Sequence, residues 1–239
     1  MSVQSTETPI FDPHYKTLYR FGGIAGILIA VFVVLAIGAY FIWPYTANET
    51  TIEALFGLLQ TDRLGALISL DVSMLVIGPV SLLLYLALYA ALRQVDKSLA
   101  LIALALNLLG VGLIIVCRPL VELVMLSNQY AIATDAAEKM RLLAAGEVLR
   151  VQLDGSAWVM QTAFLMLAGL LNSLLMLRSR FFSKATAWLG IVISAAGLGF
   201  FLPEIGLLFL FFNTIGTIPW CLLMARYLFK IAQIASKPA

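Results

Sequence analysis

The chain has 239 residues, of which 62% are hydrophobic and 12% are charged, and its formal net charge is +2. A soluble domain is roughly half apolar and a quarter charged, so this composition indicates an integral membrane protein. The small net charge and the lack of a basic run exclude nucleic acid as a partner. The one histidine, His14, lies in a polar N-terminal segment, and Cys117 and Cys221 lie in apolar segments. We therefore expect no cofactor and no metal site.

Six stretches of the sequence are long and apolar enough to cross a lipid bilayer as helices. They cover residues 21–43, 64–92, 99–126, 151–177, 185–202 and 205–229. The expected fold is an all-α, polytopic membrane bundle over residues 21–230, with tails at residues 1–20 and 231–239. Gly22 and Gly26 either allow a close helix contact or are simply the glycines common in membrane helices.

The two longer loops are predicted to carry short amphipathic helices. Apolar residues recur there at helical spacing, at Ile52, Leu55, Phe56 and Leu59 in the first loop and at Ala137, Met140, Ala144 and Val148 in the second. Asp135 followed by Glu138 resembles a capping pair at the start of the second helix.

The basic residues predict the orientation of the chain. Both tails, the 93–98 turn and the 178–184 turn lie on one side of a six-helix topology, and this side holds ten of the 15 lysines and arginines. The other side holds four, and Arg118 lies within a predicted span. Because basic loops stay in the cytoplasm, we expect a multi-pass protein of the cytoplasmic membrane with both termini inside.

Arg118, Pro119 and Glu122 interrupt an otherwise apolar run in the third predicted helix. Asp71 lies at a similar distance from the outer end of the second helix, which is an antiparallel neighbour. An ion pair between Asp71 and Arg118 would avoid an isolated charge in the hydrocarbon, and Glu122 lies on the same helical face one turn away. Arg118 is therefore predicted to bridge two carboxylates.

Polar residues on two other helices are expected at the same depth as Arg118. On the fourth and sixth helices they share one face at helical spacing. They are Asp154, Trp158 and Gln161 on the fourth helix and Asn213 and Thr217 on the sixth. With Asp71, Arg118 and Glu122, these residues form the predicted ligand-binding set, which would line a polar site open to the outside.

Three functions are compatible with such a site. The first is the binding or transport of a small polar or anionic ligand, because ionisable residues inside a membrane are functional candidates. The second is a structural or accessory subunit of a membrane complex, in which the buried ion pairs only hold the bundle together and Gly190 and Ser194 on the fifth helix would form the docking contact. The third is an intramembrane enzyme with Asp71 and Glu122 as acid and base. The sequence has no nucleophile beside a base and no metal-ligand cluster, which disfavours an enzyme.

Three segments resemble a known family. They are Gly22-Gly23-Ile24-Ala25-Gly26, Leu88-Tyr89 with Val95-Asp96-Lys97-Ser98-Leu99-Ala100, and residues 176–191, MLRSRFFSKATAWLGI. The chain resembles an uncharacterised family of six-helix bacterial integral membrane proteins, known as a domain of unknown function. The resemblance implies a bacterial plasma-membrane protein with six spans, and it brings no catalytic or binding residues.

Overall fold

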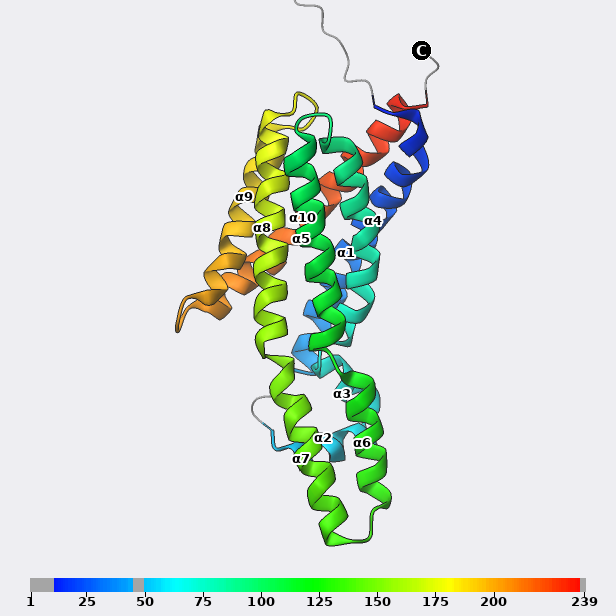
Figure 1. The fold of residues 1–239 in the computed structure, drawn as a ribbon, viewed down its shortest axis with the longest axis vertical. Coiled ribbons are helices and arrows are strands. Elements are labelled where there is room, and N and C mark those ends of the chain that lie inside the picture. The colour runs from blue at the N-terminus through cyan, green and yellow to red at the C-terminus, as the bar shows by residue number, and fades with distance from the viewer. Residues whose placement is uncertain (1–10, 45–49, 237–239) are drawn as a thin grey trace, which may run out of the picture. The chain divides into compact units, whose positions relative to one another are not determined.

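The computed structural model of the chain describes residues 11–44 and 50–236, and throughout these residues the regular structure is helical (Figure 1). Parts of the two predicted tails, residues 1–10 and 237–239, and residues 45–49 of the first loop lie outside the described residues. Within the described residues, six helical stretches are long and apolar enough to cross a membrane. The prediction of an all-α protein with six membrane-spanning helices is therefore confirmed.

The helices vary widely in length. They are η1 (Pro13–Tyr15), α1 (Lys16–Ile42), α2 (Ile52–Thr61), α3 (Arg63–Ser69), α4 (Val72–Leu92), α5 (Lys97–Cys117), α6 (Leu120–Ile132), α7 (Ala136–Leu153), α8 (Ser156–Arg178), α9 (Lys184–Leu198), η2 (Gly199–Phe201) and α10 (Gly206–Ile234). Side-chain oxygens of Thr51, Asp62, Asp135 and Ser183 cap the N-termini of α2, α3, α7 and α9. The cap at Asp135, which accepts from the Glu138 amide at 3.1 Å, agrees with the predicted start of this helix.

Three of the predicted continuous helices are broken. The 64–92 prediction corresponds to α3 and α4 with Asp71 between them, and the 99–126 prediction corresponds to α5 and α6. The predicted start at residue 151 is also wrong, because α7 continues to Leu153 and α8 begins at Ser156. Pro119 favours the α5–α6 break, since it lacks an amide donor and disfavours a helical conformation in the residue before it. Asp71 has a positive φ of 61°, which ends a helix and which aspartate tolerates better than most residues.

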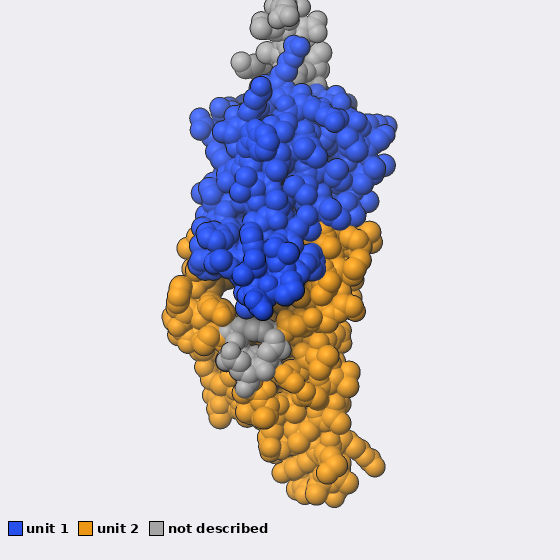
Figure 2. All heavy atoms as spheres, turned by 90° about the vertical axis from the view of Figure 1, so that its left-hand side faces the viewer, with its two compact units in different colours: residues 1–30, 81–106, 166–239 blue, residues 31–80, 107–165 orange. Residues whose placement is uncertain are grey.

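Two compact units make up the chain, coloured separately in Figure 2. Unit 1 comprises Met1–Ala30, Ser81–Leu106 and Met166–Ala239, and unit 2 comprises Val31–Val80 and Asn107–Leu165. The helices α1, α4, α5 and α8 contribute residues to both units, whereas α9 and α10 belong to unit 1 and α2, α3, α6 and α7 to unit 2.

In unit 1, glycines bring α1 close to its neighbours. A Cβ atom on Gly22 would lie 2.3 Å from the Cβ atom of Ala87, and one on Gly26 would lie 2.9 Å from the carbonyl oxygen of Cys221 in α10. Both distances are too short for a side chain. The close-packing interpretation of Gly22 and Gly26 is therefore the correct one.

The N-terminal segment of unit 1 is packed as far as it is described. Phe11 is buried, and its ring centroid lies 4.9 Å from that of Phe181. The carboxylate of Asp12 pairs with the guanidinium of Arg93 at 2.9 Å. The predicted tail to residue 20 is thus too long, because α1 already begins at Lys16.

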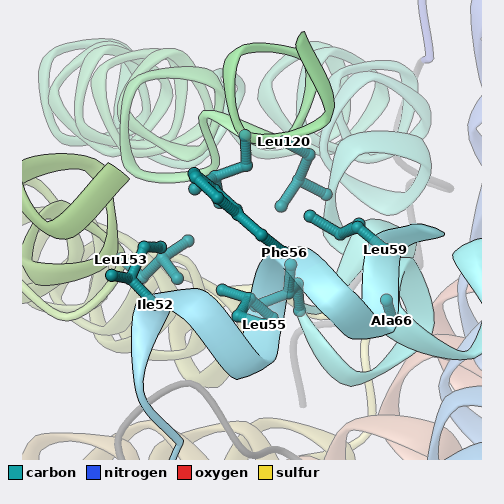
Figure 3. Packing of buried hydrophobic residues seen from close by; sticks show 9 residues of the cluster. Ile52, Leu55, Phe56, Leu59, Ala66, Leu120 and Leu153 are labelled. Carbon is teal, nitrogen blue, oxygen red and sulfur yellow. The ribbon is translucent and has the colours of Figure 1, made fainter. Parts of the chain in front are cut away.

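In unit 2, α2 packs its apolar face against α6 and α7. Figure 3 shows side chains from these helices and α3 pointing toward one another. The cluster consists of Ile52, Leu55, Phe56, Leu59, Ala66, Leu70, Leu120, Leu123 and Leu153. The four apolar positions predicted in the first loop are thus the ones that α2 buries.

The buried face of α7 differs from the predicted one. Met140 and Val148 are 72% and 68% exposed, whereas Leu143 and Leu149 pack against the cluster. Gly146 lies so close to α2 that a Cβ atom there would be 2.5 Å from the Phe56 ring. Apolar residues occur on both faces of α7, so the contact with α2 decides which face is buried.

Gly22→Ala tests the close packing of α1. We expect it to destabilise the protein by about 1–3 kcal/mol, since the backbone must move to accept the added methyl group. Gly38→Ala in the same helix is the matched control, because nothing lies within 4 Å of a Cβ atom there. The control should be neutral or up to about 1 kcal/mol more stable. Equal unfolding temperatures of the two variants in detergent would contradict the close contact.

Candidate functional site: a buried arginine at three helix breaks

Arg118 lies at the break between α5 and α6 and is buried, with 3% of its surface exposed. Its position follows from Pro119, which stops α5 and becomes the N-cap residue of α6. A buried guanidinium needs acceptors for its donors and a compensating negative charge. Unit 2 supplies the negative charge and acceptors for Nη1 and Nη2, whereas Nε is buried without a hydrogen-bond partner among the described residues.

The guanidinium of Arg118 binds the C-terminal ends of two helices. Its Nη1 atom donates to the carbonyl oxygen of Leu153 at 2.7 Å and to that of Cys117 at 3.1 Å. Leu153 and Cys117 are the last residues of α7 and α5, where the carbonyls have no partner within the helix and the helix dipole is negative. Arg118 therefore caps both helices at once.

Asp71 provides the compensating charge. Its Oδ2 atom accepts from Nη2 of Arg118 at 3.2 Å, so the predicted ion pair is present. The arginine side chain is 1% exposed and the aspartate side chain 36%.

Two residues of the predicted set on α8 also lie near Arg118. The Trp158 ring covers its guanidinium, with 4.5 Å from Cζ to the ring centroid, a cation–π geometry. Gln161 is buried, and its Oε1 atom lies 4.0 Å from the Cys117 sulfur. Asp154 is exposed at the α7–α8 break, and its charge acts on Asp71.

Glu122 does not join the cluster. It lies in the first turn of α6 with an exposed side chain, and among the described residues Arg118 forms an ion pair with Asp71 alone. The predicted two-carboxylate bridge is therefore wrong, because the break at Pro119 removes the shared helical face. Asp71 and Glu122 are not brought together as an acid and base pair either.

Asn213 and Thr217 belong to unit 1, and each donates a hydrogen bond to a backbone carbonyl of that unit. The Asn213 amide donates to the carbonyl oxygen of Ile193 at 2.8 Å, and the Thr217 hydroxyl donates to the carbonyl oxygen of Asn213 at 2.8 Å.

The docking face predicted on α9 faces the inside of unit 1. Gly190 and Ser194 are buried, and a Cβ atom on Gly190 would lie 2.2 Å from the Ser173 hydroxyl of α8.

A cavity of about 300 Å³ in unit 2 is bounded by Asp71 but not by the other seven residues of the predicted set. Its walls come from α1, α3 and the start of α4 and are mainly apolar, with Tyr40, Ser69 and Ser73 as polar members. Tyr40, Ser69 and Ser73 were not in the predicted set, because serine and tyrosine in apolar helices give no distinctive signal. In the part of the chain that the structure describes, no three His, Cys, Asp or Glu residues are grouped to hold a metal ion.

A family model described as "Domain of unknown function (DUF4386)" matches residues 24–231. The chain belongs to this family. The match covers all six candidate spans in whole or in part, together with the residues around Arg118. No curated protein and no solved structure matches the chain.

Arg118→Met tests the role of the arginine. We expect a loss of about 3 kcal/mol, because Asp71 loses its cation and two helix-end carbonyls lose their donor. Arg118→Met combined with Asp71→Asn should recover part of this loss, because the uncompensated charge is gone. Glu122→Gln, which removes an exposed carboxylate from the same unit, should change stability by less than about 0.5 kcal/mol. An Arg118→Met protein that unfolds at the same temperature as Glu122→Gln would contradict the capping role.

Proposed function

We propose that this multi-pass membrane protein binds a small ligand in the Asp71 cavity of unit 2. The observation that carries the proposal is the position of Asp71, which lies on the cavity wall while its Oδ2 atom is held by Arg118. The residue has a left-handed backbone, a strained conformation that tends to persist where a site needs it. Arg118 acts in this proposal as a positioning residue.

The charges around the cavity favour a ligand that donates hydrogen bonds. Asp71 is the one charged residue among the described residues of the cavity wall, and its partner Arg118 is buried away from that wall. The Oδ1 atom of Asp71 accepts no hydrogen bond from the described residues and is available to a donor. We therefore propose an amine with an apolar body, in place of the anionic ligand that Arg118 suggested from the sequence alone.

We further propose that the protein lies in the cytoplasmic membrane of a bacterium with both termini inside. The support is the distribution of basic residues, ten on one side of the six spans and four on the other. In this topology the turn between α6 and α7 faces the outside, and the α8–α9 turn faces the cytoplasm.

Ligand binding can be tested with hexylamine, hexanol and hexanoate as probes on the purified protein at neutral pH. We expect hexylamine alone to raise the unfolding temperature, since a ligand that binds the folded state stabilises it. Asp71→Asn should abolish the effect while keeping the backbone, because asparagine also tolerates a positive φ.

Two further variants distinguish the cavity from a general charge effect. Ala36→Leu should fill the cavity and abolish the response without removing the Asp71–Arg118 pair. Glu122→Gln should leave the response intact. The proposal fails if hexanoate stabilises as well as hexylamine, or if Glu122→Gln loses the response to the same extent as Asp71→Asn.

The orientation can be tested by labelling intact cells with a membrane-impermeant maleimide. Cys117 and Cys221 are buried, so the native protein should react little. Lys139→Cys in α7 should be labelled in intact cells, whereas Arg180→Cys in the α8–α9 turn should be labelled only after permeabilisation. The reverse pattern would place both termini outside.

A further inference from the structure

Unit 1 contains a groove of about 470 Å³ between α1 and the C-terminal half of α10. The two helices lie side by side there, with a Cβ atom on Gly23 of α1 meeting the Phe229 ring of α10 at 2.8 Å (Figure 1). The groove is lined by Ile27, Leu222, Ala225, Arg226, Phe229, Lys230 and Gln233. It is distinct from the Asp71 cavity, which lies in unit 2.

The lining has a polar end and an apolar end. On α10, Leu222, Arg226, Lys230 and Gln233 share one face, because they are spaced by three or four residues. The polar residues occupy the C-terminal part of this face, and Leu222 of α10 and Ile27 of α1 supply apolar surface toward the middle of the helices. At about 1.5 Å per residue, the face from Leu222 to Gln233 is roughly 16 Å long.

Among the described residues, the two cations of the groove have no anionic partner. The ion pairs of the described residues involve Arg93, Arg118 and Arg150, whereas Arg226 and Lys230 are exposed and form none. They lie one helical turn apart, where like charges repel each other. A doubly coordinated anion would remove this repulsion.

We propose that this groove binds an anionic phospholipid. The phosphate group would lie between Arg226 and Lys230, with Gln233 as an additional donor, and an acyl chain would follow Leu222 and Ile27. Basic pockets between membrane helices near the bilayer surface suit acidic headgroups for this reason. The combination of two unpaired cations with an apolar groove distinguishes the site from isolated surface charges.

The test compares phosphatidylglycerol, phosphatidylcholine and inorganic phosphate added to the full-length protein in neutral detergent. The unfolding temperature and the lipid retained in native mass spectrometry are both measured. We expect phosphatidylglycerol to stabilise the protein and to remain bound, and the other two to do neither. Arg226→Gln with Lys230→Gln should weaken phosphatidylglycerol binding roughly tenfold or more.

Two matched variants make the result specific. Arg178→Gln with Arg180→Gln removes the same charge from exposed residues of the same unit and should keep the lipid response. Exchanging the two cations, Arg226→Lys with Lys230→Arg, should retain most of it. The proposal is wrong if both charge-removing variants lose the response equally, if wild-type protein does not distinguish the two lipids, or if inorganic phosphate alone has the same effect.

Discussion

The guanidinium of Arg118 connects segments of unit 2 that are far apart in the sequence. Its donors reach the last carbonyls of α5 and α7 and the carboxylate of Asp71, and the Trp158 ring covers its face. A lysine could not replace it, because an ammonium group lacks the planar set of donors that contacts several acceptors in fixed directions. The breaks between α3 and α4, α5 and α6, and α7 and α8 each leave backbone groups unpaired. Arg118 satisfies one such carbonyl at each of two breaks, those of Cys117 and Leu153, and at the third break it pairs with the side chain of Asp71.

The contacts of Arg118 change the functional interpretation of this buried charge in an apolar segment. An arginine among membrane helices is easily interpreted as an anion site, but here Nη1 and Nη2 both donate to the protein and Nε is buried. The accessible member of the pair is Asp71, which is held in place on the wall of a mainly apolar cavity. In the proposed site, the Asp71 carboxylate would contact the ligand and determine which ligands bind. Arg118 would only hold this carboxylate in position.

The sequence contained enough information for the six spans and for the ion pair between Asp71 and Arg118, whereas it left open whether Gly22 and Gly26 make a close helix contact. The spans follow from hydropathy, and the ion pair follows from the cost of an unpaired charge in an apolar segment. The helix breaks could not be predicted in the same way, because proline alone does not decide them. Pro79 and Pro219 lie inside continuous helices, whereas Pro119 ends one. The difference depends on Arg118 and on acceptors such as the Leu153 carbonyl, which are distant in the sequence.

The connection at Arg118 also affects how the protein can respond to the bilayer. Helices that are free to slide past one another can adjust individually when the hydrocarbon layer becomes thinner or thicker. The starts of α4 and α8 and the end of α5 meet at one guanidinium, through Asp71, Trp158 and Cys117. A change in the tilt of one of these helices would therefore act on the other two through Arg118. Lipids of different acyl-chain length would then change the shape of the Asp71 cavity as well as the tilt of the spans, because Asp71 lines the cavity and also pairs with Arg118 at the helix ends.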